Sequence, residues 1–187
     1  MGRIVYFTGG ARSGKSTQAE HYIFERPYSK RIYVATSIPF DEEMKSRVKK
    51  HREQRGENWT TIEGYKDLVD KISPHIESGG VILLDCLTNM VTNLMIMDRE
   101  YDWDNISTVE VDRLEESIKI EVEKLFEYVK NQPVDMVVVS NELGMGVIPA
   151  YPLGRYFRDI CGRMNQIAGA YADEAYMAVS GLKLKLK

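Results

Sequence analysis

Short runs of apolar residues alternate along the chain with longer stretches in which apolar residues recur every three or four positions. The runs are typical of strands that are buried on both faces, and they predict strands at residues 3–7, 31–36, 81–85, 134–140 and 175–180. The periodic stretches, with a cap-like Asp41 before one of them, predict helices at residues 16–25, 41–55, 108–130 and 152–171. Lys and Leu alternate over residues 183–187, as in an edge strand.

The order of these elements indicates an α/β fold. Strands separated by helices favour a mostly parallel sheet with helices on both faces, here with an antiparallel edge strand at the end of the chain. No repeat, low-complexity segment or Pro/Gly-rich linker interrupts residues 1–187, so we expect a single domain. In such sheets the ligand binds beyond the carboxyl ends of the strands.

Composition narrows the classes of function. The chain of 187 residues has 25 Lys and Arg against 28 Asp and Glu, a net charge of −3, which argues against a protein built to coat nucleic acid. No apolar run approaches the roughly 18–20 residues that cross a bilayer, and the chain starts with no secretory pattern. Cys86 and Cys161 are too few for a disulfide framework or a four-cysteine zinc site. We therefore expect a cytoplasmic protein with no membrane insertion.

A complete phosphate-loop pattern, G-x-x-x-x-G-K-[ST], follows the first predicted strand and precedes the first predicted helix. Glycines let the backbone wrap a phosphate, the lysine reaches the outer phosphates, and the serine hydroxyl is a ligand for Mg²⁺. The pattern predicts a nucleoside triphosphate site of the P-loop NTPase, RecA-like type. Its residues are Gly9, Gly10, Ala11, Arg12, Ser13, Gly14, Lys15 and Ser16.

Asp85 closes the apolar run Val-Ile-Leu-Leu and is the best candidate for a second magnesium partner beside Ser16. The alternative is an ordinary solvated aspartate at a strand end. The segment 141–149 also follows a strand and combines an acid, Glu142, with a glycine-rich turn, as an active-site loop does. Its two glycines could equally serve turn geometry alone.

Six of the eleven residues at positions 45–55 are Lys or Arg, and His51 lies among them. On a helix, Arg47, His51 and Arg55 share one face, which suits a polyphosphate. Neighbouring cations disfavour protonation of an imidazole, and the neutral imidazole is the nucleophilic form. The alternative is a solvated charged face, or a histidine at the edge of the core. His21 and His75 have weaker settings and are interpreted as structural or surface residues.

Several separated segments together resemble one family, the bifunctional adenosylcobinamide kinase/adenosylcobinamide-phosphate guanylyltransferases of cobalamin biosynthesis. The segments cover nearly the whole chain: residues 8–16, 33–37, 41–52, 59–63, 83–94, 140–149 and 156–166. The phosphate loop is common to many families. The His-Arg helix followed by Asn-Glu-x-Gly-x-Gly is much more specific.

The resemblance implies two reactions. Adenosylcobinamide is first phosphorylated on its aminopropanol hydroxyl by ATP or GTP with Mg²⁺. A histidine then takes GMP from GTP and passes it to adenosylcobinamide phosphate, giving adenosylcobinamide-GDP. The resemblance also suggests a homo-oligomer, with a trimer suspected.

The residues that the resemblance implies fall on matching positions of this chain. The guanylylated histidine falls on His51, which with Lys15 is expected to be catalytic. The nucleotide contacts fall on the loop from Gly9 to Thr17, on Thr36 and Ser37, on His51, Arg52, Glu53 and Gln54, and on Glu63 and Asp85. The general base of the kinase step stays open among Glu63, Glu142 and Asp85.

The chain departs from the family pattern at two places. It has Arg55-Gly56 where members often have Arg-Pro, and Lys50 where some have a second histidine. Only one candidate nucleophile therefore remains in that helix. Two other functions stay open: a small-molecule kinase of the P-loop class without nucleotidyl transfer, and a RecA-like nucleotide-dependent switch or motor.

Overall fold

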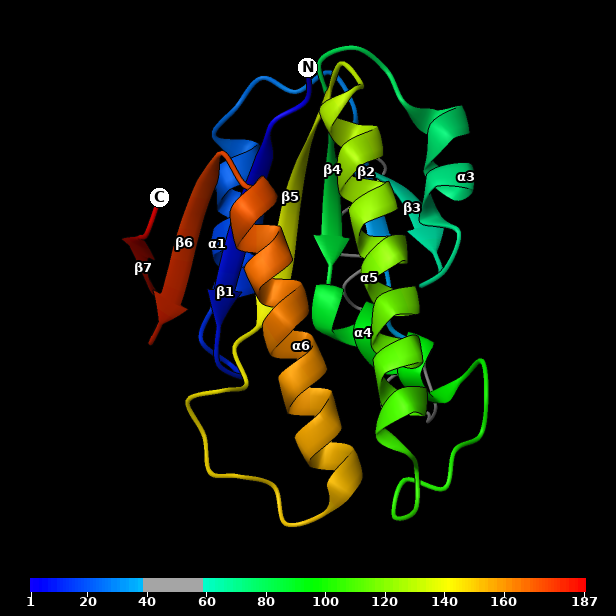
Figure 1. Cartoon of the computed structure of the whole chain (residues 1–187). Helices are drawn as coiled ribbons and strands as arrows, with labels where there is room; N and C mark the ends of the chain where they lie inside the picture. Colours follow the sequence, from blue (N-terminus) through cyan, green and yellow to red (C-terminus); the bar gives the residue numbers. More distant parts are fainter. Residues whose placement is uncertain (39–58) are drawn as a thin grey trace.

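A computed structural model describes residues 1–38 and 59–187 of the chain. The described strands form one seven-stranded sheet in the order β3-β2-β4-β5-β1-β6-β7 (Figure 1). All neighbouring strands are parallel except β6 and β7, which are antiparallel. The strands are β1 (Ile4–Gly9), β2 (Arg31–Ala35), β3 (Trp59–Glu63), β4 (Gly80–Asp85), β5 (Val134–Asn141), β6 (Glu174–Val179) and β7 (Leu182–Lys185). This arrangement confirms the predicted α/β class and its antiparallel edge.

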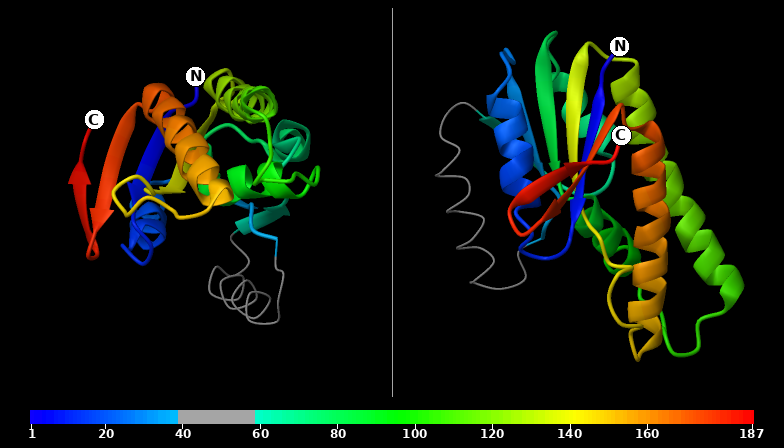
Figure 2. Two further views of the ribbon diagram at one scale, coloured as in Figure 1. Left: turned by 60° about the horizontal axis from the view of Figure 1, so that its bottom comes forward. Right: turned by 90° about the vertical axis from the view of Figure 1, so that its left-hand side faces the viewer.

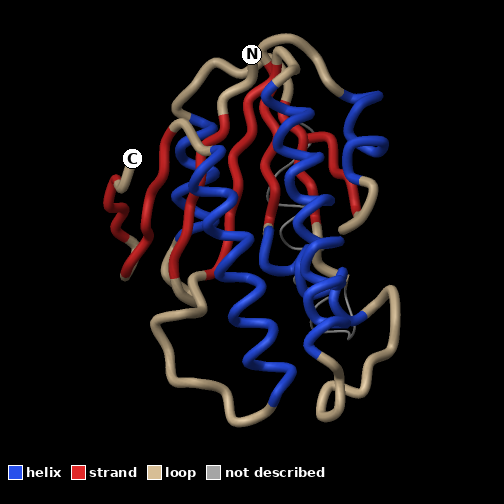
Figure 3. The backbone as a smooth tube through the Cα atoms, viewed as in Figure 1, coloured by secondary structure: helices blue, strands red, loops and turns tan. Residues whose placement is uncertain are grey.

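Helices cover both faces of the sheet (Figures 2 and 3). Side chains alternate along a strand, so β1 places Ile4 and Tyr6 in the larger core cluster beneath α4, α5 and α6, and Val5 and Phe7 in the smaller cluster beneath α1. The helices are α1 (Lys15–Phe24), α3 (Leu68–Ile72), a 3₁₀ turn (Ser73–His75), α4 (Leu87–Ile96), α5 (Thr108–Lys130) and α6 (Pro152–Tyr171). Among the described residues, no helix is both long enough and apolar enough to span a membrane.

Most predicted elements are present with shifts of a few residues at their ends, whereas β3, α3, the 3₁₀ turn and α4 were not predicted. The edge strand β3 has two half-buried threonines in its middle, which dilute its apolar signal. The helix α3 has five residues, too few to show a period. In α4 seven of ten residues are buried, including Thr88 and Asn93, so no polar stripe marks it as a helix. The predicted helix at residues 41–55 lies outside the described residues.

The parallel strands bring the predicted site residues to one edge of the sheet. Gly9 is in register with Asn141, Ala35 with Asp85, and Ala35 also with Glu63. These residues end β1, β5, β2, β4 and β3, so the row runs along the carboxyl ends of the strands. This is the edge at which open α/β sheets bind their ligands.

Candidate nucleotide site

The loop between β1 and α1 folds back on itself. The Ser13 N–H donates to the Gly10 carbonyl at 3.2 Å, and α1 begins at Lys15 directly after Gly14, whose φ is 90°. The N-cap residue, Gly14, has no side chain with which to cap the first amides of α1. Free amides at a helix start, together with the helix dipole, form a natural site for an anion.

Glycine is required at position 9 because the loop presses against its neighbours there. A Cβ at Gly9 would lie 2.4 Å from the Ala178 carbonyl oxygen and 2.6 Å from the Ser13 hydroxyl oxygen. The Ser13 hydroxyl is buried, and the structure shows no hydrogen-bond partner for it within residues 1–38 and 59–187. Leaving a buried hydroxyl without a hydrogen-bond partner costs free energy. A phosphate oxygen bound in the loop would supply such a partner.

Lys15 bends over the loop, and its Nζ donates to the Gly10 carbonyl oxygen at 3.1 Å. Burial lowers the pKa of Lys15 from its ordinary value, while Cys86 and Asp85 act in the opposite direction. The ammonium is therefore partly removed from water and electrostatically coupled to the end of β4. A phosphate is a stronger partner for such a cation than a neutral carbonyl.

The other predicted loop residues lie around this centre. Ser16 is half-buried in the first turn of α1, whereas Ala11, Arg12 and Thr17 are exposed. Arg12 has φ 58°, a left-handed conformation that helps the loop turn. The inner side of the loop is therefore buried, and its outer side is exposed to solvent.

Asp85 lies at the end of β4, half-buried, and its Oδ2 accepts a hydrogen bond from the Tyr33 hydroxyl at 3.0 Å. Hydroxyl and carboxylate oxygens such as those of Ser16 and Asp85 are the ligands that Mg²⁺ takes from protein, with phosphates and water completing its shell. Within the described part of the chain, no group of three or more His, Cys, Asp or Glu residues could hold a metal ion by itself. Ser16 and Asp85 therefore fit a magnesium ion that binds together with a nucleotide.

Thr36 is fully buried, and its side chain has a structural task. Its hydroxyl donates to the Cys86 carbonyl at 2.7 Å and accepts from the Cys86 N–H at 2.8 Å. The Asn93 side chain donates to the Thr36 carbonyl at 2.6 Å. These bonds tie the end of β2 to the start of α4, and Ser37 follows half-buried at the same edge.

The three candidate bases have different surroundings. Glu63 is exposed at the end of β3. Glu142 donates its N–H to the Gly9 carbonyl at 3.0 Å, and its carboxylate accepts from the N–H groups of Gly144 and Met145 at 2.6 and 3.1 Å. The carboxylate of Glu142 therefore shapes its own loop, while its backbone fastens that loop to the phosphate loop.

Four predicted site residues, His51, Arg52, Glu53 and Gln54, lie outside the described residues, as do Arg47 and Arg55. The structure therefore describes the phosphate loop and the strand ends of the predicted site. Both the helix predicted at residues 41–55 and the role of His51 stay predictions.

The sequence did not predict a network of polar side chains that lies at the end of β5. The Thr88 hydroxyl lies 3.0 Å from that of Ser140 and accepts from the Asn141 N–H at 2.6 Å. Asn165 accepts from Ser140 at 2.6 Å and donates to the Asn141 carbonyl at 2.9 Å. The network joins α4, α6 and the end of β5. Its only sequence signal is the presence of small polar residues within apolar stretches.

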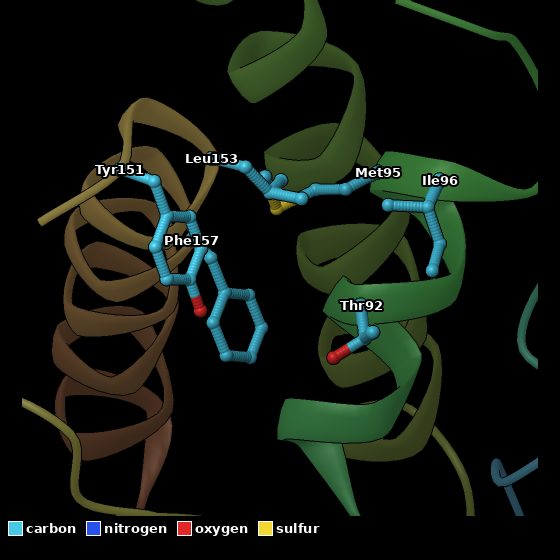
Figure 4. Close-up of a pocket in the computed structure, with 7 residues that line it drawn as sticks. Thr92, Met95, Ile96, Tyr151, Leu153 and Phe157 are labelled. Carbon is cyan, nitrogen blue, oxygen red and sulfur yellow. The ribbon is translucent and has the colours of Figure 1, made fainter. Parts of the chain in front are cut away.

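An apolar pocket lies between α4 and the start of α6 (Figure 4). The described residues that line it carry no charge: Thr92, Met95, Ile96, Tyr151, Leu153, Gly154 and Phe157. Phosphates therefore suit the loop after β1 rather than this pocket.

Comparison with solved structures supports the fold. The chain is similar to a Pyrococcus horikoshii OT3 protein (structural study PH0250), with a TM-score of 0.53 and 8% identity over 99% of this chain and 86% of that one. It is also similar to an ATPase from the type III secretion system of pathogenic bacteria, with a TM-score of 0.51 and 8% identity over 95% of this chain and 51% of that one. At such low identity these likenesses show the fold alone.

Comparison with known sequences is more specific. The chain is 40% identical to the bifunctional adenosylcobalamin biosynthesis protein CobU of Escherichia coli (strain K12), over 98% of this chain and 99% of that one. It is 34% identical to the bifunctional adenosylcobalamin biosynthesis protein CobP of Pseudomonas aeruginosa, over 96% of this chain and 94% of that one. The family described as cobinamide kinase / cobinamide phosphate guanyltransferase matches residues 5–186. With the phosphate loop, the strand-end Asp85 and a match over nearly its full length, the chain belongs to the cobinamide kinase / cobinamide phosphate guanyltransferase family.

Proposed function

We propose that this protein phosphorylates the aminopropanol hydroxyl of adenosylcobinamide with ATP or GTP, and then transfers GMP from GTP to the product. The second reaction gives adenosylcobinamide-GDP. Family membership over residues 5–186 supports both reactions. The observation that carries the proposal is the phosphate loop after β1, where the buried Ser13 hydroxyl has no hydrogen-bond partner among the described residues and Lys15 donates to the Gly10 carbonyl.

In the kinase step the loop amides and Lys15 hold the β- and γ-phosphates. The substrate hydroxyl oxygen attacks the γ-phosphorus, the bond to the β-phosphate oxygen breaks, and the nucleoside diphosphate leaves. Ser16 and Asp85 would hold Mg²⁺, which offsets the negative charge of the phosphates when bound. A carboxylate takes the hydroxyl proton; Glu63, Asp85 and Glu142 are the candidates, and Glu142 already accepts two amide hydrogen bonds.

In the transfer step we propose His51 as the carrier of GMP. An imidazole nitrogen attacks the α-phosphorus of GTP, and the bond to pyrophosphate breaks. An oxygen of the substrate phosphate then attacks the same phosphorus, and the nitrogen–phosphorus bond breaks. Arg47, Arg52 and Arg55 supply cations near His51 in the sequence, and Arg52, Glu53 and Gln54 complete the proposed nucleotide contacts.

The proposal includes the setting of the enzyme. We propose that it acts in the cytoplasm as a homo-oligomer, with a trimer as the specific expectation, and without nucleic acid. Light scattering of the purified chain across a range of concentrations measures the oligomeric state. A mass of one chain at all concentrations would contradict this part of the proposal.

The experiment that tests the function uses GTP labelled either at the α- or at the γ-phosphate, with Mg²⁺. We expect acid-labile label on the protein from α-labelled GTP only, and none on His51→Ala. With adenosylcobinamide present, γ-label should pass to the corrinoid in both proteins. Transfer of γ-label without any α-label on the wild-type protein would leave a small-molecule kinase and contradict guanylyl transfer.

A further inference from the structure

The turn between β6 and β7 packs against the phosphate loop, although the two lie far apart in the sequence. The strands pair Val179 with Leu182, so Ser180 and Gly181 form the turn, with φ 52° and 82°. Positive φ at both central residues matches the tight hairpin turn that suits strand twist. Figure 2 (right) shows this turn next to the loop between β1 and α1.

Both backbone polar groups of Gly181 bond to the nucleotide-binding element. The Gly181 N–H donates to the Ser13 carbonyl at 2.9 Å. The Gly181 carbonyl accepts from the side-chain amide of Gln18, in α1, at 2.7 Å. The approach is close, because a Cβ at Gly14 would lie 3.1 Å from the Gly181 Cα.

The bond to Ser13 fixes the orientation of one peptide group. In a trans peptide the carbonyl and the following N–H point in opposite directions. Because the Ser13 carbonyl points to the turn, the Gly14 N–H points away from it. Gly14 precedes Lys15 at the start of α1, where loop amides meet phosphate in a site of this kind.

Strand β6 contributes Ala175 and Ala178 to the buried core, but burial of apolar surface does not explain why the turn and β7 are there. All four residues of β7 are exposed, and Val179 and Leu182 beside the turn are 53% and 75% exposed. The turn therefore adds little to the core. It is tied to the phosphate loop and α1 by its contacts with Ser13, Gly14 and Gln18.

We propose that the β6–β7 turn, held by Gln18, is a positioning element that fixes the Ser13–Gly14 peptide so that the Gly14 N–H faces the outer phosphates of the bound nucleotide. Gln18 touches neither nucleotide nor acceptor in this account and acts through Gly181. The inference rests on the proposed function, because it assumes a triphosphate in the loop.

The test compares Gln18→Met with Gln132→Met. Methionine keeps the length of the glutamine side chain and its helix propensity but lacks the amide donor. Gln132 precedes β5, at the opposite end of the sheet from the phosphate loop, so its variant controls for the same chemical change. Calorimetry measures the affinity of each full-length protein for inorganic triphosphate, for GTP and for GMP, all with Mg²⁺, alongside the thermal midpoint.

We expect Gln18→Met to bind inorganic triphosphate and GTP about fivefold more weakly, the effect of one neutral hydrogen bond. Its affinity for GMP, which lacks the outer phosphates, should equal that of the wild type. In the kinase step the KM for the triphosphate should rise while kcat is kept. Gln132→Met should match the wild type in every measurement.

Two results would overturn the inference while leaving the proposed function intact. One is wild-type affinity for triphosphate in Gln18→Met. The other is an equal loss for triphosphate and GMP together with a lowered thermal midpoint, which would mark Gln18 as merely structural. If the wild-type protein binds neither inorganic triphosphate nor GTP, the assignment of the phosphate site is wrong. The inference about the turn is then wrong as well.

Discussion

Lys15 holds its ammonium against a neutral carbonyl, that of Gly10, in a partly buried position. A bound phosphate would replace the hydrogen bond to this neutral carbonyl with stronger, charge-assisted hydrogen bonds. The motif predicts that this lysine binds a phosphate. The contact with Gly10 could not be predicted, because it depends on the path of the loop.

Replacing Lys15 with alanine should weaken the binding of ATP and GTP by roughly tenfold to a hundredfold, the effect of losing a hydrogen bond from a charged group. Both reactions should suffer, since both use a triphosphate. Fluorescence titration with a labelled nucleotide measures the change. Lys30→Ala, which removes a surface ion pair with Glu77 near the start of β2, is the matched control. Unchanged affinity in Lys15→Ala would contradict the site.

Glu174 at the start of β6 gives a prediction about pH. A hydrogen bond from the Tyr176 hydroxyl lowers the pKa of the Glu174 carboxyl, and Tyr22 and Arg3 act in the same direction. Because its folded pKa lies below the unfolded value, the stability it contributes is present above the unfolded pKa and is lost as pH falls through the folded pKa.

We therefore expect Glu174→Gln to unfold at lower urea concentration than wild type at pH 7, with the gap closing under acidic conditions. Urea midpoints across the acid range measure this difference. A gap that is constant with pH would show that packing, rather than the charge of Glu174, is responsible.

At the scale of elements, buried polar bonds join helices to strand ends. Asn93 of α4 is 2% exposed and donates to the Thr36 carbonyl at the end of β2. Apolar runs could predict most strands, but not which strands pair, because β1 pairs with β5 and β6 from distant parts of the chain. The role of the Thr36 hydroxyl could not be predicted from sequence either, because only the pairing of β2 with β4 brings its partner Cys86 close.

Asn93→Leu should lower the free energy of unfolding by about 1–3 kcal/mol, because it leaves a buried carbonyl without this donor. Chemical denaturation measures the loss. Thr92→Val is the neighbouring control, since the Thr92 hydroxyl bonds only back to its own helix at the Thr88 carbonyl among the bonds described. Equal effects of the two substitutions would contradict a special role for the link between α4 and β2.

At the scale of the whole molecule, one sheet edge gathers the phosphate loop, Asp85 and the loop that starts at Glu142. This convergence could be predicted from sequence, because parallel strands end at the same edge. The groups proposed to hold the phosphates and Mg²⁺ in the kinase step, Lys15, Ser16 and Asp85, lie there. The proposed transfer step also needs a nucleophile, and the family resemblance predicts His51 for that role.

The position of the GMP adduct on the protein shows whether His51 is the nucleophile. The wild-type protein is incubated with GTP and Mg²⁺, digested at neutral to alkaline pH, and its peptides are sequenced by mass spectrometry. The chain has three histidines. We expect GMP on His51 alone, at a level that rises with GTP and vanishes in Lys15→Ala at limiting GTP. GMP on His21 or His75, or an unmodified His51 in a protein that still makes the guanylylated product, would contradict it.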